Sequence, residues 1–130
     1  MKQNQDNGYV STVLIVDDEA SVRKTLKVLL QKEGYNLEFA EGGQEALAKA
    51  VEHTPDMVLL DVMMPDMDGF EVCRRLRAIP TLAEVPIIMI TALDDRDCHL
   101  EAIEAGADDF ISKPLDRVSL RTRLRATLRL

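Results

Sequence analysis

The sequence predicts an α/β protein built on a doubly wound parallel sheet. Segments with strand-like and helix-like hydrophobic patterns alternate five times along the 130 residues, which is typical of parallel sheets with helices on both faces. Three of the strand segments, 13–16, 57–60 and 87–90, are continuous apolar tetrads. Such runs suit central strands that are covered on both faces. The other two strand segments are alternating or short, so we expect them at the sheet edges.

The first β-α-β unit follows a leader. Residues 1–10 are mostly polar and read as a disordered leader, so the domain itself is expected over 11–130. After the strand at 13–16, apolar side chains recur at helical spacing on one face, at Val22, Leu26, Leu29 and Leu30. Gly34 stands where a glycine commonly ends a helix. Residues 35–39 then alternate between apolar and polar side chains, which indicates an edge strand.

The second and third helices precede the two remaining apolar tetrads. The second helix has an apolar face of Ala46, Leu47, Ala50 and Val51, and leads into the strand at 57–60. The third helix leads into the strand at 87–90, and its apolar face consists of Phe70, Cys73 and Leu76. Each helix therefore has one face that can pack on the sheet.

The last two helices flank a short strand at 109–111. The fourth helix is expected after Asp94, a candidate N-cap, with Gly106 near its end. Its apolar face is expected to be Leu100, Ile103 and Ala107. The fifth helix follows Asp116, another candidate N-cap, and its apolar face consists of Leu120, Leu124 and Leu128.

Edge character for the second strand fits the order 2-1-3-4-5 of a flavodoxin-like sheet with five helices. In such a sheet the functional site lies beyond the carboxyl ends of the strands, near the switch in strand order. Chemically distinctive residues stand at those ends: Asp17 and Asp18 after the first strand, Asp61 after the third, Thr91 after the fourth and Lys113 after the fifth. We therefore expect these side chains to meet at one edge.

Clustered carboxylates predict a cation site. Like charges raise each other's pKa, so such a cluster stays ionised only beside a counter-charge. Mg²⁺ suits it, because this ion accepts a few protein carboxylates together with waters and phosphate oxygens. A carboxylate nucleophile, a metal, an ammonium group and a hydroxyl together are typical of phosphoryl transfer. Taken alone, Asp17 and Asp18 would be interpreted as capping the next helix.

The segments 16–19, 60–69, 90–92 and 112–114 carry a family signature in the right order and on the right elements. Over about residues 12–129 the chain resembles the receiver domain of bacterial two-component response regulators. The resemblance implies a cytoplasmic signalling switch, not a turnover enzyme. Its phosphodonor would be a sensor histidine kinase, a phosphotransfer protein or a small phosphodonor.

By this resemblance Asp61 is the phosphoacceptor. The metal ligands would be the carboxylates of Asp17, Asp18 and Asp61, together with the backbone carbonyl of Met63. The metal would be Mg²⁺, and Mn²⁺ is expected to substitute for it.

The resemblance also assigns catalytic and switching residues. Thr91 and Lys113 would bind the phosphoryl oxygens, and the peptide bond between Lys113 and Pro114 would be cis. Phe110 matches the family's switch aromatic, which moves inward when the threonine moves toward the phosphoryl group. The family often has Tyr at this position; Phe keeps the packing but has no hydroxyl.

Asp109 and Arg123 match a pair that joins two copies in the winged-helix transcription-factor branch of the family. We therefore expect phosphorylation to favour a homodimer through the fourth helix, the fifth strand and the fifth helix. Exposed ion pairs contribute little individually, so this pair would determine geometry more than affinity.

The composition disfavours several other classes. A net charge of −7, 4% aromatic residues and the absence of Trp disfavour direct nucleic-acid binding. No apolar run approaches the roughly 18 residues of a membrane span, and the start lacks a signal-peptide pattern, so we expect a cytoplasmic location and no membrane contact. Cys73 and Cys98 are expected to be reduced. His53 and His99 read as surface residues.

Three alternatives fit the residues less well than the phosphoryl switch does. An EF-hand calcium loop fails, because Met64 and Arg75 would occupy its first and last ligand positions, so a turn and a helix cap before Gly69 are preferred. A haloacid-dehalogenase-type hydrolase needs an acid/base Asp where Met63 stands. A non-phosphorylated scaffold would not need the five residues at the strand ends, which are Asp17, Asp18, Asp61, Thr91 and Lys113.

A chain ending after the fifth helix fits a single-domain regulator and also a receiver followed by an effector.

Overall fold

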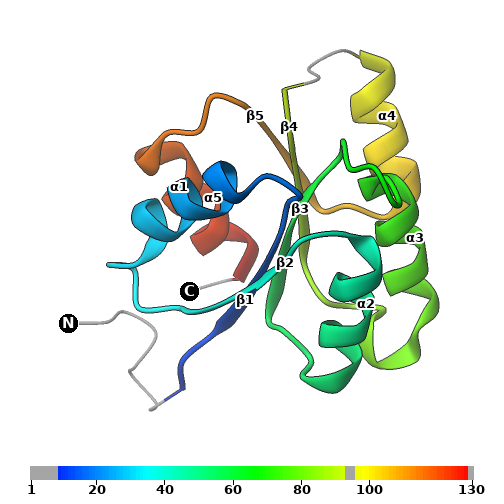
Figure 1. The fold of residues 1–130 in the computed structure, drawn as a ribbon, viewed down its shortest axis with the longest axis horizontal. Coiled ribbons are helices and arrows are strands. Elements are labelled where there is room, and N and C mark those ends of the chain that lie inside the picture. The colour runs from blue at the N-terminus through cyan, green and yellow to red at the C-terminus, as the bar shows by residue number, and fades with distance from the viewer. Residues whose placement is uncertain (1–8, 93–95, 129–130) are drawn as a thin grey trace.

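The computed structural model describes residues 9–92 and 96–128, which form five parallel strands alternating with five α-helices (Figure 1). In chain order the elements are β1 (Thr12–Val16), α1 (Ala20–Leu30), β2 (Asn36–Ala40), α2 (Gly43–Glu52), β3 (Met57–Asp61), α3 (Gly69–Ala78), the short 3-10 helix η2 (Pro80–Leu82), β4 (Ile87–Thr91), α4 (Arg96–Ala105), β5 (Asp109–Ser112) and α5 (Arg117–Leu128).

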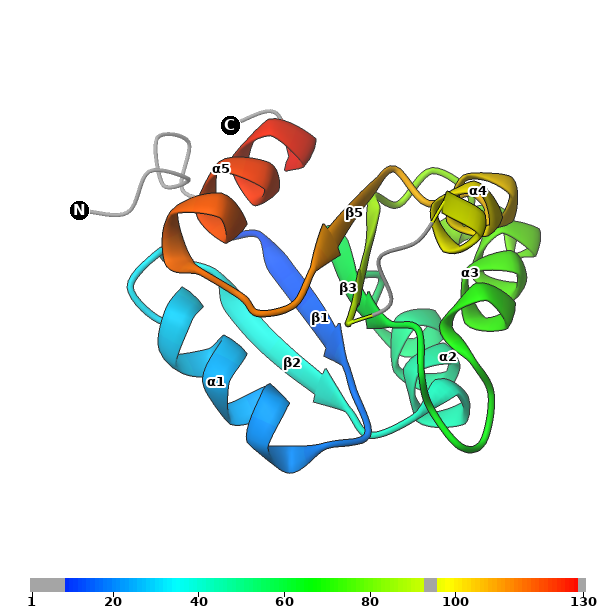
Figure 2. The ribbon, with the colours of Figure 1, turned by 90° about the horizontal axis from the view of Figure 1, so that it is seen from above.

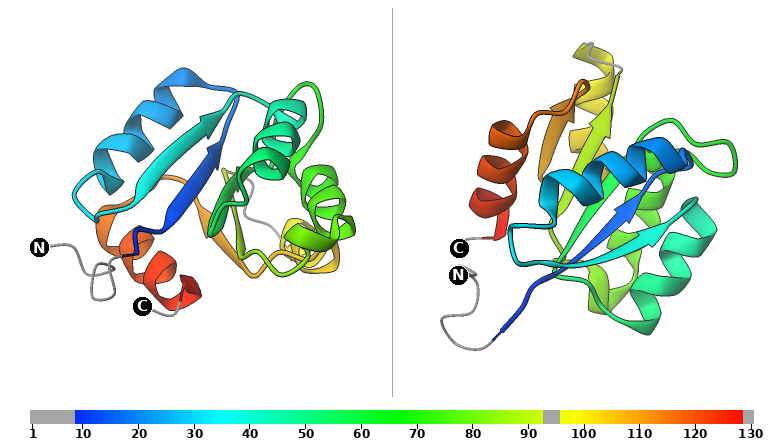
Figure 3. Two further views of the ribbon diagram at one scale, coloured as in Figure 1. Left: turned by 90° about the horizontal axis from the view of Figure 1, so that it is seen from below. Right: turned by 60° about the vertical axis from the view of Figure 1, so that its left-hand side comes forward.

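The strands form one sheet in the order β2-β1-β3-β4-β5, which confirms the predicted flavodoxin-like architecture. Each neighbouring pair is parallel, and Figure 3 shows the arrowheads of β1 and β2 pointing the same way. In the register of the central strands, Val16 of β1 lies opposite Leu60 of β3, and Asp61 lies opposite Ile90 of β4. The strand ends that carry the predicted site residues therefore lie together.

The helices form two layers. Helices α1 and α5 cover one face of the sheet, and α2, α3 and α4 cover the other (Figures 1 and 2). Successive strand side chains point to opposite faces, so Val13 and Ile15 join the cluster under α1 and α5, whereas Leu14 and Val16 join the other cluster. This two-sided burial explains the continuous apolar tetrads.

The predicted faces of three helices are correct. Leu26 and Leu30 of α1 are buried, as are all three predicted residues of α3 and the first two of α5. Helix α2 buries Ala46 and Ala50, but Val51 is 58% exposed. Gly34 and Gly106 follow α1 and α4 with positive φ, a conformation that glycine adopts readily at helix ends.

The predicted face of α4 is wrong. Leu100 and Ile103 are 48% and 68% exposed, and the buried residues are instead Cys98, Ala102 and Ala105. Their spacing of four and three residues is an equally regular helical stripe. These side chains are small, so α4 packs closely on its neighbours while its bulkier apolar residues face outward.

The described part of the leader is anchored to the strand layer. The Tyr9 hydroxyl donates a hydrogen bond to Asp56, and the same carboxylate accepts the Thr12 N–H at 2.7 Å. Residues 1–8 and Asp94 lie outside the described residues, so the leader and that N-cap stay predictions.

Cys73 and Cys98 are buried free thiols, and burial raises the pKa of Cys73 to about 11.

Within 9–92 and 96–128, no helix has the length and apolar character to cross a membrane.

Candidate functional site

Three carboxylates meet where β1 and β3 end. Asp17 and Asp18 directly follow β1, and Asp61 is the last residue of β3. One carboxylate oxygen from each lies within 4.8 Å of the others. Asp17 and Asp61 are buried, at 2% and 5% exposure, whereas Asp18 is exposed. The adjacency of β1 and β3 therefore brings together the three predicted metal-binding side chains.

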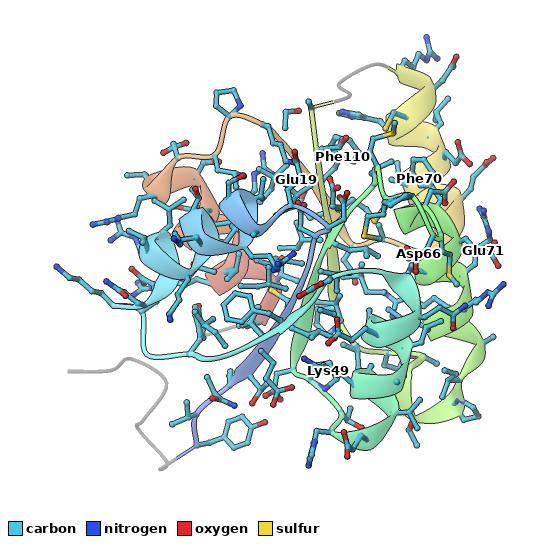
Figure 4. All side chains as sticks on the ribbon, in the orientation of Figure 1. Glu19, Lys49, Asp66, Phe70, Glu71 and Phe110 are labelled. Carbon is cyan, nitrogen blue, oxygen red and sulfur yellow. The ribbon has the colours of Figure 1, made fainter. Side chains whose placement is uncertain are left out.

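Backbone contacts hold Asp17 in place on several sides. Its N–H donates to the Ala40 carbonyl at 3.1 Å, which extends the pairing of β1 with β2. Its carboxylate accepts the Glu19 N–H at 2.9 Å, and its carbonyl accepts a hydrogen bond of 2.6 Å from Arg23 Nη1. Figure 4 labels Glu19 where the chain enters α1. Asp17 thus organises the local turn and also faces the carboxylate cluster.

Lys113 is the cation of the cluster. Its Nζ lies 3.6 Å from Asp17 Oδ2 and 3.5 Å from Asp61 Oδ1. The Lys113 N–H donates to the Thr91 carbonyl at 2.9 Å, and the following bond to Pro114 is cis. The end of β4 therefore positions the lysine that follows β5.

The electrostatics of the site favour a further cation. Burial, and next the neighbouring Asp17, raise the pKa of Asp61 from 3.8 to about 6. Burial also raises the pKa of Asp17. Lys113 offers one positive charge to three carboxylates. The donor set of clustered carboxylate oxygens, short of positive charge, fits Mg²⁺, which binds through a few carboxylates and retains exchangeable positions.

Thr91 and Phe110, the two predicted switch residues, lie on the neighbouring strands β4 and β5. Thr91 ends β4 and is fully buried, in register with Ser112 of β5. Phe110 is partly buried, and its ring centroid lies 4.1 Å from that of His99 on α4. His99 is exposed, as predicted, but no sequence pattern indicates its contact with Phe110 (labelled in Figure 4).

The start of α3 is pressed against the end of β3. A Cβ atom on Gly69 would lie 2.3 Å from the Asp61 carbonyl oxygen, so only glycine fits there. The Gly69 N–H also donates to the Val62 carbonyl at 2.8 Å. Asp68 caps α3 by accepting the Glu71 N–H at 2.9 Å, as the turn-and-cap interpretation predicted. The Met63 side chain in this loop is 60% exposed.

Asp109 and Arg123 meet within one chain. Arg123 Nη1 lies 2.8 Å and 3.0 Å from the two carboxylate oxygens of Asp109. The sequence analysis predicts this ion pair between the two copies of a dimer. To form it there, each copy would first have to break its internal ion pair between Asp109 and Arg123.

Sequence reasoning missed two residues near the site. Arg23 lies outside the predicted apolar face of its helix, yet its side chain is only 17% exposed and reaches back to Asp17. Asp66 lies in the predicted turn before α3, yet its carboxylate accepts backbone N–H groups at the start of α2. The tandem glycines at 42–43 were the available signal for the second contact.

Comparison with known proteins identifies the family of this fold and site. The sequence model described as the response regulator receiver domain matches residues 13–125. The chain belongs to this family. Receiver domains are regulatory switches of two-component signalling, and an acidic Mg²⁺ pocket is typical of them, consistent with the carboxylate cluster here.

Individual relatives support the same family assignment. The chain is 48% identical over 118 residues to the response regulator PleD of Caulobacter vibrioides, covering 90% of this chain and 26% of PleD. It is 44% identical over 118 residues to the phosphate regulon transcriptional regulatory protein PhoB of Pseudomonas aeruginosa, covering 91% and 52%. The solved chemotaxis protein CheY4 of Vibrio cholerae superposes with a TM-score of 0.88 at 34% identity, covering 92% and 99%. The chain thus spans about a quarter of PleD and about half of PhoB.

Proposed function

We propose that this receiver domain is a phosphoryl-accepting switch in which Asp61 takes the phosphoryl group. The observation that carries the proposal is the position of the Asp61 carboxylate. It is buried, it lies within 4.8 Å of two other carboxylates, and it is 3.5 Å from an ammonium group. A nucleophilic carboxylate beside such charges is what phosphoryl transfer requires.

The metal site is formed by Asp17, Asp18 and Asp61, with the Met63 carbonyl as the backbone ligand. Mg²⁺, or Mn²⁺ in its place, supplies positive charge that offsets the charge on the phosphoryl oxygens. The phosphodonor is a sensor histidine kinase or a phosphotransfer protein in the cytoplasm, or a small phosphodonor. With a phosphohistidine donor, an Asp61 oxygen bonds to phosphorus while the donor's phosphorus–nitrogen bond breaks, and the imidazole leaves with that electron pair. With a small phosphodonor, the bond from phosphorus to the donor's own leaving group breaks instead, and that group takes the electron pair. The Lys113 ammonium stabilises the charge that spreads over the phosphoryl oxygens.

The switch runs from Thr91 to the face formed by α4, β5 and α5. Once Asp61 is phosphorylated, the Thr91 hydroxyl donates a hydrogen bond to the phosphoryl group. The space that this movement leaves is filled by Phe110, which gives up its present contact with His99. Phosphorylation thus favours one of two packings, and the exposed face changes shape.

The phosphorylated form is proposed to dimerise through that face. Asp109 and Arg123 exchange their internal pair for a pair between two copies, which keeps the number of ion pairs unchanged. The pair therefore determines the geometry of the dimer more than its affinity. The effector that reads this form is a protein partner and not nucleic acid or a membrane.

Beryllofluoride tests the proposal, because with a divalent metal it mimics the phosphorylated carboxylate. Size exclusion with light scattering and amide NMR should show a larger species and shifts in α4 and β5 when beryllofluoride and Mg²⁺ are added together. The Asp61→Asn variant should show neither change when beryllofluoride and Mg²⁺ are added together. An unchanged wild-type spectrum would favour a scaffold, and turnover of a small phosphate ester would favour a hydrolase.

A further inference from the structure

The first turn of α2 is capped by a residue from a distant part of the chain. The N-cap position of this helix is Gly42, which has no side chain to accept hydrogen bonds from the first N–H groups. The Asp66 carboxylate takes that place: one oxygen accepts the Gly43 N–H at 3.3 Å and the other accepts the Gln44 N–H at 3.2 Å. Figure 4 shows Asp66 beside the start of α2. These backbone bonds lower the pKa of Asp66.

Two consecutive glycines make room for this contact. A Cβ atom on Gly42 would lie 2.9 Å from Asp66 Oδ1 and 3.0 Å from Oδ2. A Cβ atom on Gly43 would lie 2.9 Å from the Cβ of Met67 in the same loop. The absence of side chains at both positions therefore allows the 62–68 loop to lie directly against the start of α2.

The contact fixes the middle of the loop that joins Asp61 to α3. The ends of the loop are already held, because the Val62 carbonyl accepts the Gly69 N–H. Between those ends, Met64 is buried in the core and Met67 packs against it, whereas the Met63 and Pro65 side chains are exposed and do not fix their own backbone. The hydrogen bonds of Asp66 therefore restrain the stretch that contains the proposed carbonyl ligand of Met63.

We propose that Asp66 is a positioning residue for the metal site. By binding the N-terminus of α2 it holds the 62–68 loop in its metal-binding conformation before the metal arrives, so that less ordering is required on binding. This inference rests on the proposed function, because it concerns the Met63 carbonyl as a ligand.

A pair of variants separates this role from simple helix capping. Asp66→Ala removes both the α2 cap and the loop restraint. Adding Gly42→Ser returns a cap from within the helix itself, since serine is a favoured N-cap and residue 42 has the extended backbone of that position, with φ −172°. The three atoms nearest to a Cβ at 42 all belong to the Asp66 carboxyl group, so the double variant has room for the serine.

Asp116 offers a matched control on another helix. Its carboxylate accepts two backbone N–H groups at the start of α5, from Val118 at 3.0 Å and from Ser119 at 3.2 Å. Asp116→Ala therefore removes a cap of the same kind without touching the 62–68 loop. It should lower the melting temperature and leave Mg²⁺ affinity as in the wild type.

Three measurements on each variant of the 130-residue chain decide the question: Mg²⁺ affinity by calorimetry, melting temperature in EDTA, and amide hydrogen exchange of Met63 and Met64 without metal. Asp66→Ala should melt roughly 3–6 °C lower and bind Mg²⁺ roughly three- to tenfold more weakly, as expected for one or two lost hydrogen bonds. The double variant should regain the melting temperature but keep the weaker affinity and the faster exchange.

Recovery of both affinity and melting temperature in the double variant would overturn the inference, and so would wild-type affinity in Asp66→Ala. Wild-type protein that does not bind Mg²⁺ would refute the proposed function itself, and the two failures are therefore distinguishable. If Asp66→Ala alone does not fold, Asp66→Asn replaces it as the single variant, since asparagine keeps one of the two acceptor oxygens. The double variant keeps alanine at 66, which leaves room for the serine.

Discussion

Replacing Asp61 with asparagine should stabilise the metal-free protein at neutral pH. The buried carboxyl group ionises less readily in the folded chain, with a pKa of about 6 against 3.8 for the ordinary group. One pKa unit corresponds to about 1.4 kcal/mol, so the ionised group costs the folded state at most ~3 kcal/mol. Exposure of the neighbouring Asp18 lets water and ions into the cluster, which reduces the expected gain to about 1–2 kcal/mol.

The pH dependence of this gain has a definite sign. Because the folded pKa lies above the unfolded one, folded wild-type protein binds more protons between about pH 3.8 and 6. Its stability therefore falls as the pH rises through that window, whereas asparagine does not titrate. The advantage of Asp61→Asn should be full above pH 6 and should vanish below about pH 3.8.

Urea unfolding in EDTA, followed by circular dichroism at several pH values, measures the difference directly. Mg²⁺ should stabilise the wild type by mass action and should stabilise Asp61→Asn much less. Asp18→Asn is the control: it removes a charge from the same cluster at an exposed position, so it should weaken the Mg²⁺ effect with little gain in EDTA. Equal or lower stability of Asp61→Asn in EDTA at neutral pH would refute the electrostatic reasoning.

Three further variants test individual contacts by urea unfolding. Lys113→Met should destabilise the metal-free protein by about 1–3 kcal/mol, between the values for exposed and for fully buried ion pairs, because two buried carboxylates lose a lysine that is itself 22% exposed. It should also abolish the beryllofluoride response. Arg77→Met should cost about 3 kcal/mol and leave Mg²⁺ affinity unchanged, because this guanidinium binds Asp108 and several carbonyls far from the metal site. Gly69→Ala should cost more than about 3 kcal/mol, because its methyl group would overlap the Asp61 carbonyl; a loss below about 1 kcal/mol would contradict that contact.

The architecture was predictable because it depends on local periodicity. Buried central strands require continuous apolar runs, and β1, β3 and β4 each have one. Parallel topology then brings the carboxyl ends of the strands to one edge, so residues that are distant in sequence become neighbours. Asp17, Asp61 and Lys113 could be grouped in this way from the sequence, and in the structure their charged atoms lie close together.

The remaining features depend on tertiary contacts that periodicity does not encode. Helix α4 contains two regular apolar stripes, and the choice between them depended on side-chain size and not on spacing. The binding of Asp66 to α2 joins positions 22 and 23 residues apart in sequence. Arg23 reaches the Asp17 carbonyl because a long side chain on the outer edge of a helix can fold back over its first turn.

Helix α4 is attached to the domain mainly by small side chains. Cys98, Ala102 and Ala105 bury little apolar area, and each contributes roughly 1–2 kcal/mol less than a buried leucine would. A flat contact of this kind has few ridges that must unlock before the helix tilts or slides. Meanwhile Leu100 and Ile103 stay in water and are available to another surface. Helix α4 can therefore move with little loss of packing, and it carries exposed apolar side chains on its outer face. Small displacements of the residues packed under this helix would then change the apolar surface that a neighbouring molecule contacts.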